Sequence, residues 1–113
     1  MTLFRLLLIV IIVTVVAYTI PVVYSEGLLT LLPSFFGEMM RLNWQGQFNL
    51  DFFTFLILSG TWVAWRNQFS VRGNLLGIGA VFLGSPYLSI YLIYLSYTCK
   101  GDLKRIFFGD REL

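Results

Sequence analysis

Residues 50–65, Leu-Asp-Phe-Phe-Thr-Phe-Leu-Ile-Leu-Ser-Gly-Thr-Trp-Val-Ala-Trp, form the stretch that decides how this chain folds. The run is largely apolar, with one acid, Asp51, near its start, and it closes on Trp62, Trp65 and Arg66. An ionised carboxylate is costly in hydrocarbon, whereas tryptophan and arginine are typical of the membrane–water interface. The pattern therefore predicts a membrane-spanning helix over about 48–65, with Asp51 at the interface, paired or protonated.

Two further apolar runs, at about 3–23 and 75–97, flank this segment. A helix needs about 20 residues to cross a hydrocarbon core of about 30 Å, and both runs reach that length. We therefore predict an all-α fold, an integral membrane three-helix bundle that forms a single domain over 1–113. The first run also resembles a secretory signal, with a passable cleavage site at Val23-Tyr24-Ser25, but we expect it to be retained as an anchor.

The connection between the first two runs is amphipathic over 28–42, with Leu, Phe and Met at roughly helical spacing. It is too short to span, and Pro33 and Gly37 interrupt it. We predict a segment that lies along the interface; the alternative is a lid over a pocket between the helices. Residues 100–113 alternate basic and apolar side chains, which predicts a short amphipathic tail helix that ends at Gly109.

The composition excludes several classes of function. Only 12% of the residues are charged, about half the usual share in soluble domains. The chain has no histidine, and its one cysteine, Cys99, cannot form an intrachain disulfide or a cysteine-rich metal site. We therefore predict no metal and no cofactor. A net charge of +2 is too small to indicate a nucleic-acid partner, and the bilayer is the expected partner of the basic residues.

The third run carries a stripe of small residues and a proline. Small side chains allow helices to approach closely in lipid, so the stripe predicts self-association or docking on a larger membrane complex. Pro86 is expected to kink this helix near its middle. The predicted packing residues are Gly73, Gly77, Ala80, Gly84, Ser85 and Ser89.

Asp51 is the best candidate for a catalytic group, although no reaction can be assigned. If the second and third helices are antiparallel, tyrosines near the end of the third helix lie at the depth of Asp51, where a phenol could donate a hydrogen bond to it. The alternative is that Asp51 caps its helix. Arg66 is expected to extend to the lipid headgroups. The candidate ligand-binding residues are Asn49, Asp51, Trp62, Tyr87, Tyr91 and Tyr94.

Three crossings would place the two termini on opposite sides of the membrane. Lysine and arginine then number five on the carboxyl-terminal side and three on the amino-terminal side, which favours a cytoplasmic carboxyl terminus. The predicted location is a bacterial inner membrane or an organelle membrane.

The chain resembles a family of small, uncharacterised three-span membrane proteins found in plants and bacteria. The similarity rests on Leu50-Asp51-Phe52, Ser59, Trp62-Val63-Ala64, Trp65 and Arg66, and on Gly84-Ser85 followed by Tyr91. The resemblance implies a three-span fold in which Asp51, Trp62 and Arg66 are family positions. It implies no activity.

Two functions are compatible with these features. The first is a structural or accessory membrane component that packs through its third helix. The alternative is a lipid- or isoprenoid-binding protein or enzyme, with Asp51 as the polar group beneath the 28–42 segment. A proton-coupled transporter ranks last, because the first span carries no acid.

Overall fold

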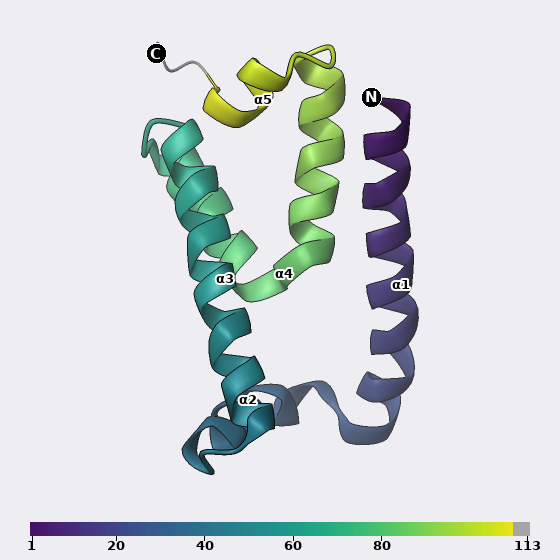
Figure 1. The fold of residues 1–113 in the computed structure, drawn as a ribbon, viewed down its shortest axis with the longest axis vertical. Coiled ribbons are helices and arrows are strands. Elements are labelled where there is room, and N and C mark those ends of the chain that lie inside the picture. Colours follow the sequence, from purple (N-terminus) through teal and green to yellow (C-terminus); the bar gives the residue numbers. More distant parts are fainter. Residues whose placement is uncertain (110–113) are drawn as a thin grey trace.

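A computed structural model describes residues 1–109, and within them the chain is helical, without a β-strand. Three helices, α1, α3 and α4, are long and apolar enough to cross a membrane, with mean hydropathies of 2.9, 1.2 and 1.7, so the three predicted apolar helices are confirmed. In chain order, the elements are α1 (Thr2–Glu26), the 3₁₀ turn η1 (Leu28–Thr30), α2 (Leu31–Met40), α3 (Trp44–Arg66), α4 (Val71–Thr98) and α5 (Leu103–Phe108) (Figure 1).

Side-chain caps fix where α3 and α4 begin. Asn43 Oδ1 accepts a hydrogen bond from the Gly46 N–H at 2.7 Å, and Ser70 Oγ accepts one from the Gly73 N–H at 3.0 Å. These bonds satisfy N–H groups that have no partner inside the helix. Because α3 starts at Trp44, Asp51 lies about two turns inside the helix. The alternative that Asp51 caps the helix is therefore wrong, since Asn43 has that role.

The main departure from the expected fold is that α4 folds back on itself at Gly84. Gly84 has φ +71° and ψ −150°, a conformation outside any helix. The arm 71–83 descends beside α3, and the arm 85–98 returns toward the end of the molecule where α4 began (Figure 1). Across the turn, the Tyr87 hydroxyl donates a hydrogen bond of 3.0 Å to the Leu76 carbonyl. In a straight helix, positions 76 and 87 would be about 16 Å apart.

The residues at the turn explain the reversal. The φ/ψ region of Gly84 is open in practice to glycine alone. Pro86 follows two residues later, where its fixed φ and missing N–H suit the first turn of the second arm. The sequence Gly-Ser-Pro thus ends one helix and starts another, where we expected a kink within a continuous helix.

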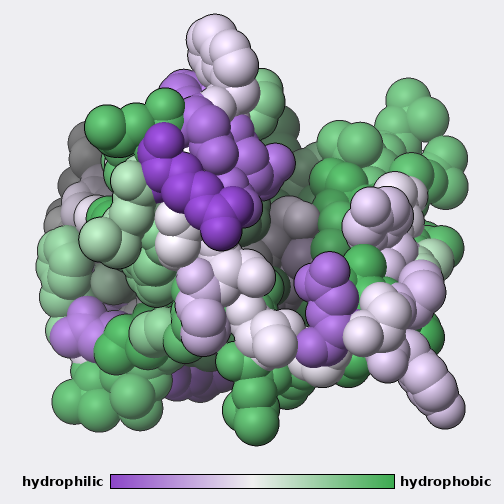
Figure 2. Space-filling model, turned by 90° about the horizontal axis from the view of Figure 1, so that it is seen from below, coloured by the Kyte–Doolittle hydropathy of each residue, from purple (hydrophilic) through white to green (hydrophobic). Residues whose placement is uncertain are grey.

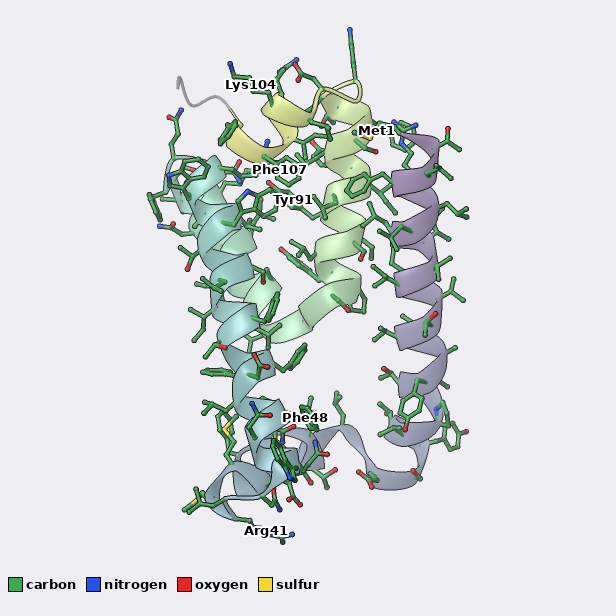
Figure 3. All side chains as sticks on the ribbon, viewed as in Figure 1. Met1, Arg41, Phe48, Tyr91, Lys104 and Phe107 are labelled. Carbon is green, nitrogen blue, oxygen red and sulfur yellow. The ribbon has the colours of Figure 1, made fainter. Side chains whose placement is uncertain are left out.

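Both ends of α4 consequently lie at the same end of the molecule. Met1 and Lys104 lie at this end, and Arg41 and Phe48 lie at the opposite one (Figure 3). The expectation of a straight third helix, which would place Met1 and Lys104 at opposite ends of the molecule, does not fit this arrangement. We call these ends the basic end and the α2 end.

Close backbone contacts hold the first arm of α4 against α3. A Cβ on Gly60 would lie 2.6 Å from the Gly77 carbonyl oxygen, and one on Gly77 would lie 2.5 Å from the Gly60 carbonyl oxygen. Only hydrogen fits at either position. The second arm packs on α1, where Arg5 donates to Ser96 Oγ at 2.8 Å and to the Ser96 carbonyl at 3.1 Å. Arg5 therefore binds within the protein.

The turn requires a glycine at position 84, and this requirement can be tested by substitution. Gly84→Ala should lower the free energy of unfolding by about 1–3 kcal/mol, the usual cost of forcing a non-glycine residue into this region. Space is not the cause, because the new Cβ would meet its nearest atom, Phe52 Cζ, at an ordinary 3.7 Å. Gly37→Ala in α2 is the matched control, because a Cβ there has no neighbour within 4 Å. It should be neutral or stabilising by up to about 1 kcal/mol.

Denaturant titration in detergent, followed by tryptophan fluorescence, measures both variants. Equal stability of Gly84→Ala and Gly37→Ala would show that α4 does not need the reversal at Gly84.

Candidate functional site

An apolar cavity lies below the turn of α4, between α1 and α3. Its volume is about 470 Å³, within the range of ligand pockets, about 300–1,000 Å³. One wall is the second half of α1, and the roof is the turn itself. The lining residues are Val15, Val16, Thr19, Ile20, Val23, Tyr24, Phe52, Leu83, Gly84, Ser85 and Pro86.

A second apolar cavity of about 340 Å³ adjoins the first on the other side of Phe52. Phe52 lines both cavities. Aromatic contacts among Phe35, Phe36 and Phe53, two of them edge-to-face, stabilise this region, with ring centroids 5.2–6.2 Å apart. The lining residues come from α2, α3 and α4: Leu31, Leu32, Phe35, Phe36, Phe52, Phe53, Leu56, Val81 and Phe82.

The two cavities are suited to apolar ligands. No charged side chain lines either one, and the Thr19 hydroxyl in the first donates to the Val15 carbonyl at 2.6 Å. Among residues 1–109, no three histidine, cysteine or acidic side chains are grouped where they could hold a metal. The chemistry available is therefore the burial of hydrocarbon next to a few hydroxyls.

Asp51 lies outside both cavities. It precedes Phe52, but its side chain is exposed and forms no hydrogen bond or salt bridge within the described part of the chain. The tyrosines expected at its depth lie toward the other end of the molecule, because the second arm of α4 runs back to the basic end (Figure 3). The structure therefore does not bring together Asp51 and Tyr91.

Asn49 and Tyr87, two more predicted ligand-binding residues, brace the fold. Asn49 Nδ2 donates to the Phe35 carbonyl at 3.0 Å, and Asn49 Oδ1 accepts from Gln45 Nε2 at 2.9 Å. Asn49 thus joins α2 to α3. Tyr87 braces the two arms of α4, as described above. Tyr94 is 52% exposed on the second arm and lines neither cavity.

Trp62 and Tyr91, the remaining pair, do come together, at the basic end and around Arg66. The Trp62 and Tyr91 ring centroids are 6.4 Å apart, and Trp62 Nε1 donates to the Phe107 carbonyl at 3.0 Å. The Tyr91 hydroxyl accepts from Arg66 Nη1 at 2.8 Å and from Asn67 Nδ2 at 2.9 Å. This cluster joins α3, the second arm of α4, and α5.

Arg66 is buried, with 7% of its surface exposed. Arg66 Nε donates to the Ile106 carbonyl at 2.7 Å, and Nη2 donates to the Arg105 carbonyl at 3.1 Å. Both carbonyls belong to the short helix α5, whose last carbonyls have few partners inside the helix. The expectation that Arg66 extends to lipid headgroups is wrong, because α5 folds over the end of α3 and covers it.

The predicted small-residue stripe is divided between the interior and the cavity. Gly73, Gly77 and Ala80 are buried where the first arm of α4 packs on α3. Gly84 and Ser85 line the cavity below the turn, and Ser89 is buried in the second arm. The first half of the surface expected to receive a partner thus already contacts α3 of the same chain.

Sequence reasoning missed the cavity wall on α1 and the role of Phe52. In an apolar run such as 15–24, nothing distinguishes a residue that faces a cavity from one that faces solvent. The only usable signal was Gly84-Ser85-Pro86, because glycine after a helix and proline in the first turn of the next mark a boundary.

Comparison of the chain with protein-family models, curated proteins and solved structures finds no match.

Proposed function

We propose that the chain is a multi-pass integral membrane protein in which α1 and α3 cross the bilayer and α4 enters and leaves on one side. Helices of 25 and 23 residues are about 37 and 34 Å long, enough for a hydrocarbon core of about 30 Å. Each arm of α4 is only about 20 Å long. Broken helices are tolerated in a membrane where they are covered by protein or line a cavity, as the turn at Gly84 does.

The charge distribution supports one orientation of this arrangement. Within residues 1–109, the α2 end carries one basic residue, Arg41, and hydrophilic side chains gather there over α2 and the start of α3 (Figure 2). The positive-inside rule therefore favours the basic end as the cytoplasmic side. The basic residues at that end are Arg5, Arg66, Arg72, Lys100, Lys104 and Arg105.

Within that arrangement, we propose that the protein binds a lipid. The observation that carries the proposal is the pair of adjoining apolar cavities on either side of Phe52. On α1, the wall runs from Val15 to Tyr24, a rise of about 14 Å. That is about half of a hydrocarbon core of about 30 Å. The occupant would therefore be the acyl chains of a lipid from the leaflet at the α2 end.

Charges near the α2 end favour a zwitterionic or neutral headgroup. Three acids, Glu26, Glu38 and Asp51, face one base, Arg41, and Glu38 is already paired with Arg41 at 3.1 Å. The remaining negative charge would repel an anionic headgroup. A structural or accessory role through the third helix has less support, because Gly73, Gly77 and Ala80 of the stripe that suggested it are buried in this chain and Gly84 and Ser85 line the cavity.

Filling the cavity tests the proposal. Val16 lines it, whereas Val13, less than a turn earlier on α1, does not and is 60% exposed. Val16→Trp should reduce the share of purified protein that retains a phospholipid by about tenfold, the effect of ~1.4 kcal/mol in binding. Val13→Trp adds the same side chain outside the cavity and should leave retention within about twofold. Native mass spectrometry of the protein in mild detergent counts the bound lipids.

Equal retention by the two variants, or wild-type protein that retains no lipid, would contradict lipid binding in this cavity.

A further inference from the structure

The basic end holds a small pocket that no function described so far uses. It lies beneath α5, has a volume of about 50 Å³, and is lined by Arg66, Asn67, Cys99, Arg105 and Gly109. That volume exceeds the ~10–15 Å³ needed for a single water molecule. Because two of the five lining residues are arginines, the pocket differs in kind from the apolar cavities on either side of Phe52.

Among residues 1–109, no acid balances the buried charge that Arg66 carries in this pocket. The partners of its guanidinium are neutral oxygens: two backbone carbonyls, the Tyr91 hydroxyl and, at 3.4 Å, Asn67 Oδ1. Within residues 1–109, the one salt bridge joins Arg41 and Glu38, at the opposite end. A guanidinium keeps its proton in proteins, and a buried charge is stable when an opposite charge accompanies it.

The donors of Arg66 are not all used. A guanidinium has five N–H groups, and four bonds leave from Nε, Nη1 and Nη2 of Arg66. One N–H group on Nη2 has no partner within the described part of the chain, and it lies beside the pocket that Arg66 helps to line. The fork of an arginine matches the oxygens of phosphate or carboxylate, so an oxyanion could take the remaining donor together with the Arg105 side chain.

The surroundings favour an anion as well. At the basic end, the described residues carry exposed cations at Arg72, Lys100, Lys104 and Arg105. The acidic residue described at this end is Asp102, whose Oδ1 accepts a hydrogen bond from the Lys104 N–H at 3.1 Å. Clustered positive charge raises the local concentration of anions, and basic pockets at the cytoplasmic ends of helices recognise lipid headgroups.

We propose that this pocket binds a phosphate oxyanion, supplied by the headgroup of a phospholipid or by free phosphate, with Arg66 and Arg105 as its ligands. The site is separate from the apolar cavities, which lie below the turn of α4. Lipid binding there does not depend on it.

The test replaces the Arg105 side chain. The backbone carbonyl at position 105, which accepts a hydrogen bond from Arg66, remains after any substitution. Arg105→Gln removes a pocket cation, whereas Lys104→Gln removes the same charge from the neighbouring exposed position outside the pocket. The first probe is dioleoyl phosphatidic acid in competition with dioleoyl glycerol, which has the same chains without the phosphate. The second probe is inorganic phosphate against chloride at equal ionic strength, with the Tm of the full chain as the readout.

If the phosphate comes from a lipid, wild-type protein and Lys104→Gln should prefer phosphatidic acid in native mass spectra. Arg105→Gln should lose about tenfold of that preference. If the source is free phosphate, the Tm of wild-type protein and Lys104→Gln should rise with phosphate, and that of Arg105→Gln should not. Equal losses in the two variants would overturn the proposal in favour of a diffuse basic surface. Absence of both responses in wild-type protein would overturn it outright. Val16→Trp should leave the preference for phosphatidic acid unchanged, which separates this site from the apolar cavities.

Discussion

Replacement of Arg66 by methionine should lower the free energy of unfolding by about 1–3 kcal/mol, and should release α5 from the end of α3. Methionine fills similar space but donates no hydrogen bond. The carbonyl of Ile106 would be left without a donor, whereas the Arg105 carbonyl keeps the Gly109 N–H and the Tyr91 hydroxyl keeps Asn67 Nδ2. Each buried polar group left without a partner costs about 1–3 kcal/mol.

Arg72→Met is the matched control for this prediction. Arg72 is exposed in the first turn of α4 and forms no hydrogen bond within residues 1–109. Its replacement should change stability by no more than about 0.5 kcal/mol. Denaturant titration measures the two variants, and hydrogen exchange of the 103–108 amides reports the release of α5. If both variants lose the same stability, Arg66 does not hold α5 in place.

The order and character of the helices could be predicted from the sequence because they depend on local composition. The runs 3–23, 48–65 and 75–97 each correspond to a long apolar helix, and the amphipathic 28–42 segment contains η1 and α2. The tail helix begins at Leu103, and Gly109 follows its end as expected. Hydropathy identifies which residues avoid water, and a periodic pattern identifies a helix.

The direction of the third helix could not be predicted in the same way. Gly84-Ser85-Pro86 is compatible with a kink and with a reversal, and contacts distant in sequence decide between them. The reversal depends on the fit of Gly60 to Gly77 and on the bond from Tyr87 to Leu76. The predicted meeting of Asp51 with the tyrosines required a straight helix, and it failed for that reason.

The residues of the candidate site could not be predicted from the sequence either. Arg66 was assigned to the headgroups because arginine after an apolar run usually extends outward, but its partners lie 25–40 residues further along the chain. The cavities arise because the turn of α4 stops partway between α1 and α3. No residue pattern in 15–24 or at Phe52 marks that space.

The reversal of α4 is the claim on which the proposed topology, the cavities and the orientation all depend. Spin labels at Val71→Cys and Thr98→Cys, in a Cys99→Ser background, test it directly. Both positions are exposed and lie at the two ends of α4. Labels at Thr2→Cys and Ser25→Cys provide the control, because they lie on the uninterrupted α1 and should be about 35 Å apart.

Pulsed electron spin resonance on the protein in lipid nanodiscs gives both distances. The folded-back α4 predicts a Val71–Thr98 separation shorter than the control, because both positions lie at the basic end of a molecule that measures 27 × 24 Å across its long axis. A separation of about 40 Å, the length of a straight helix over these residues, would contradict it.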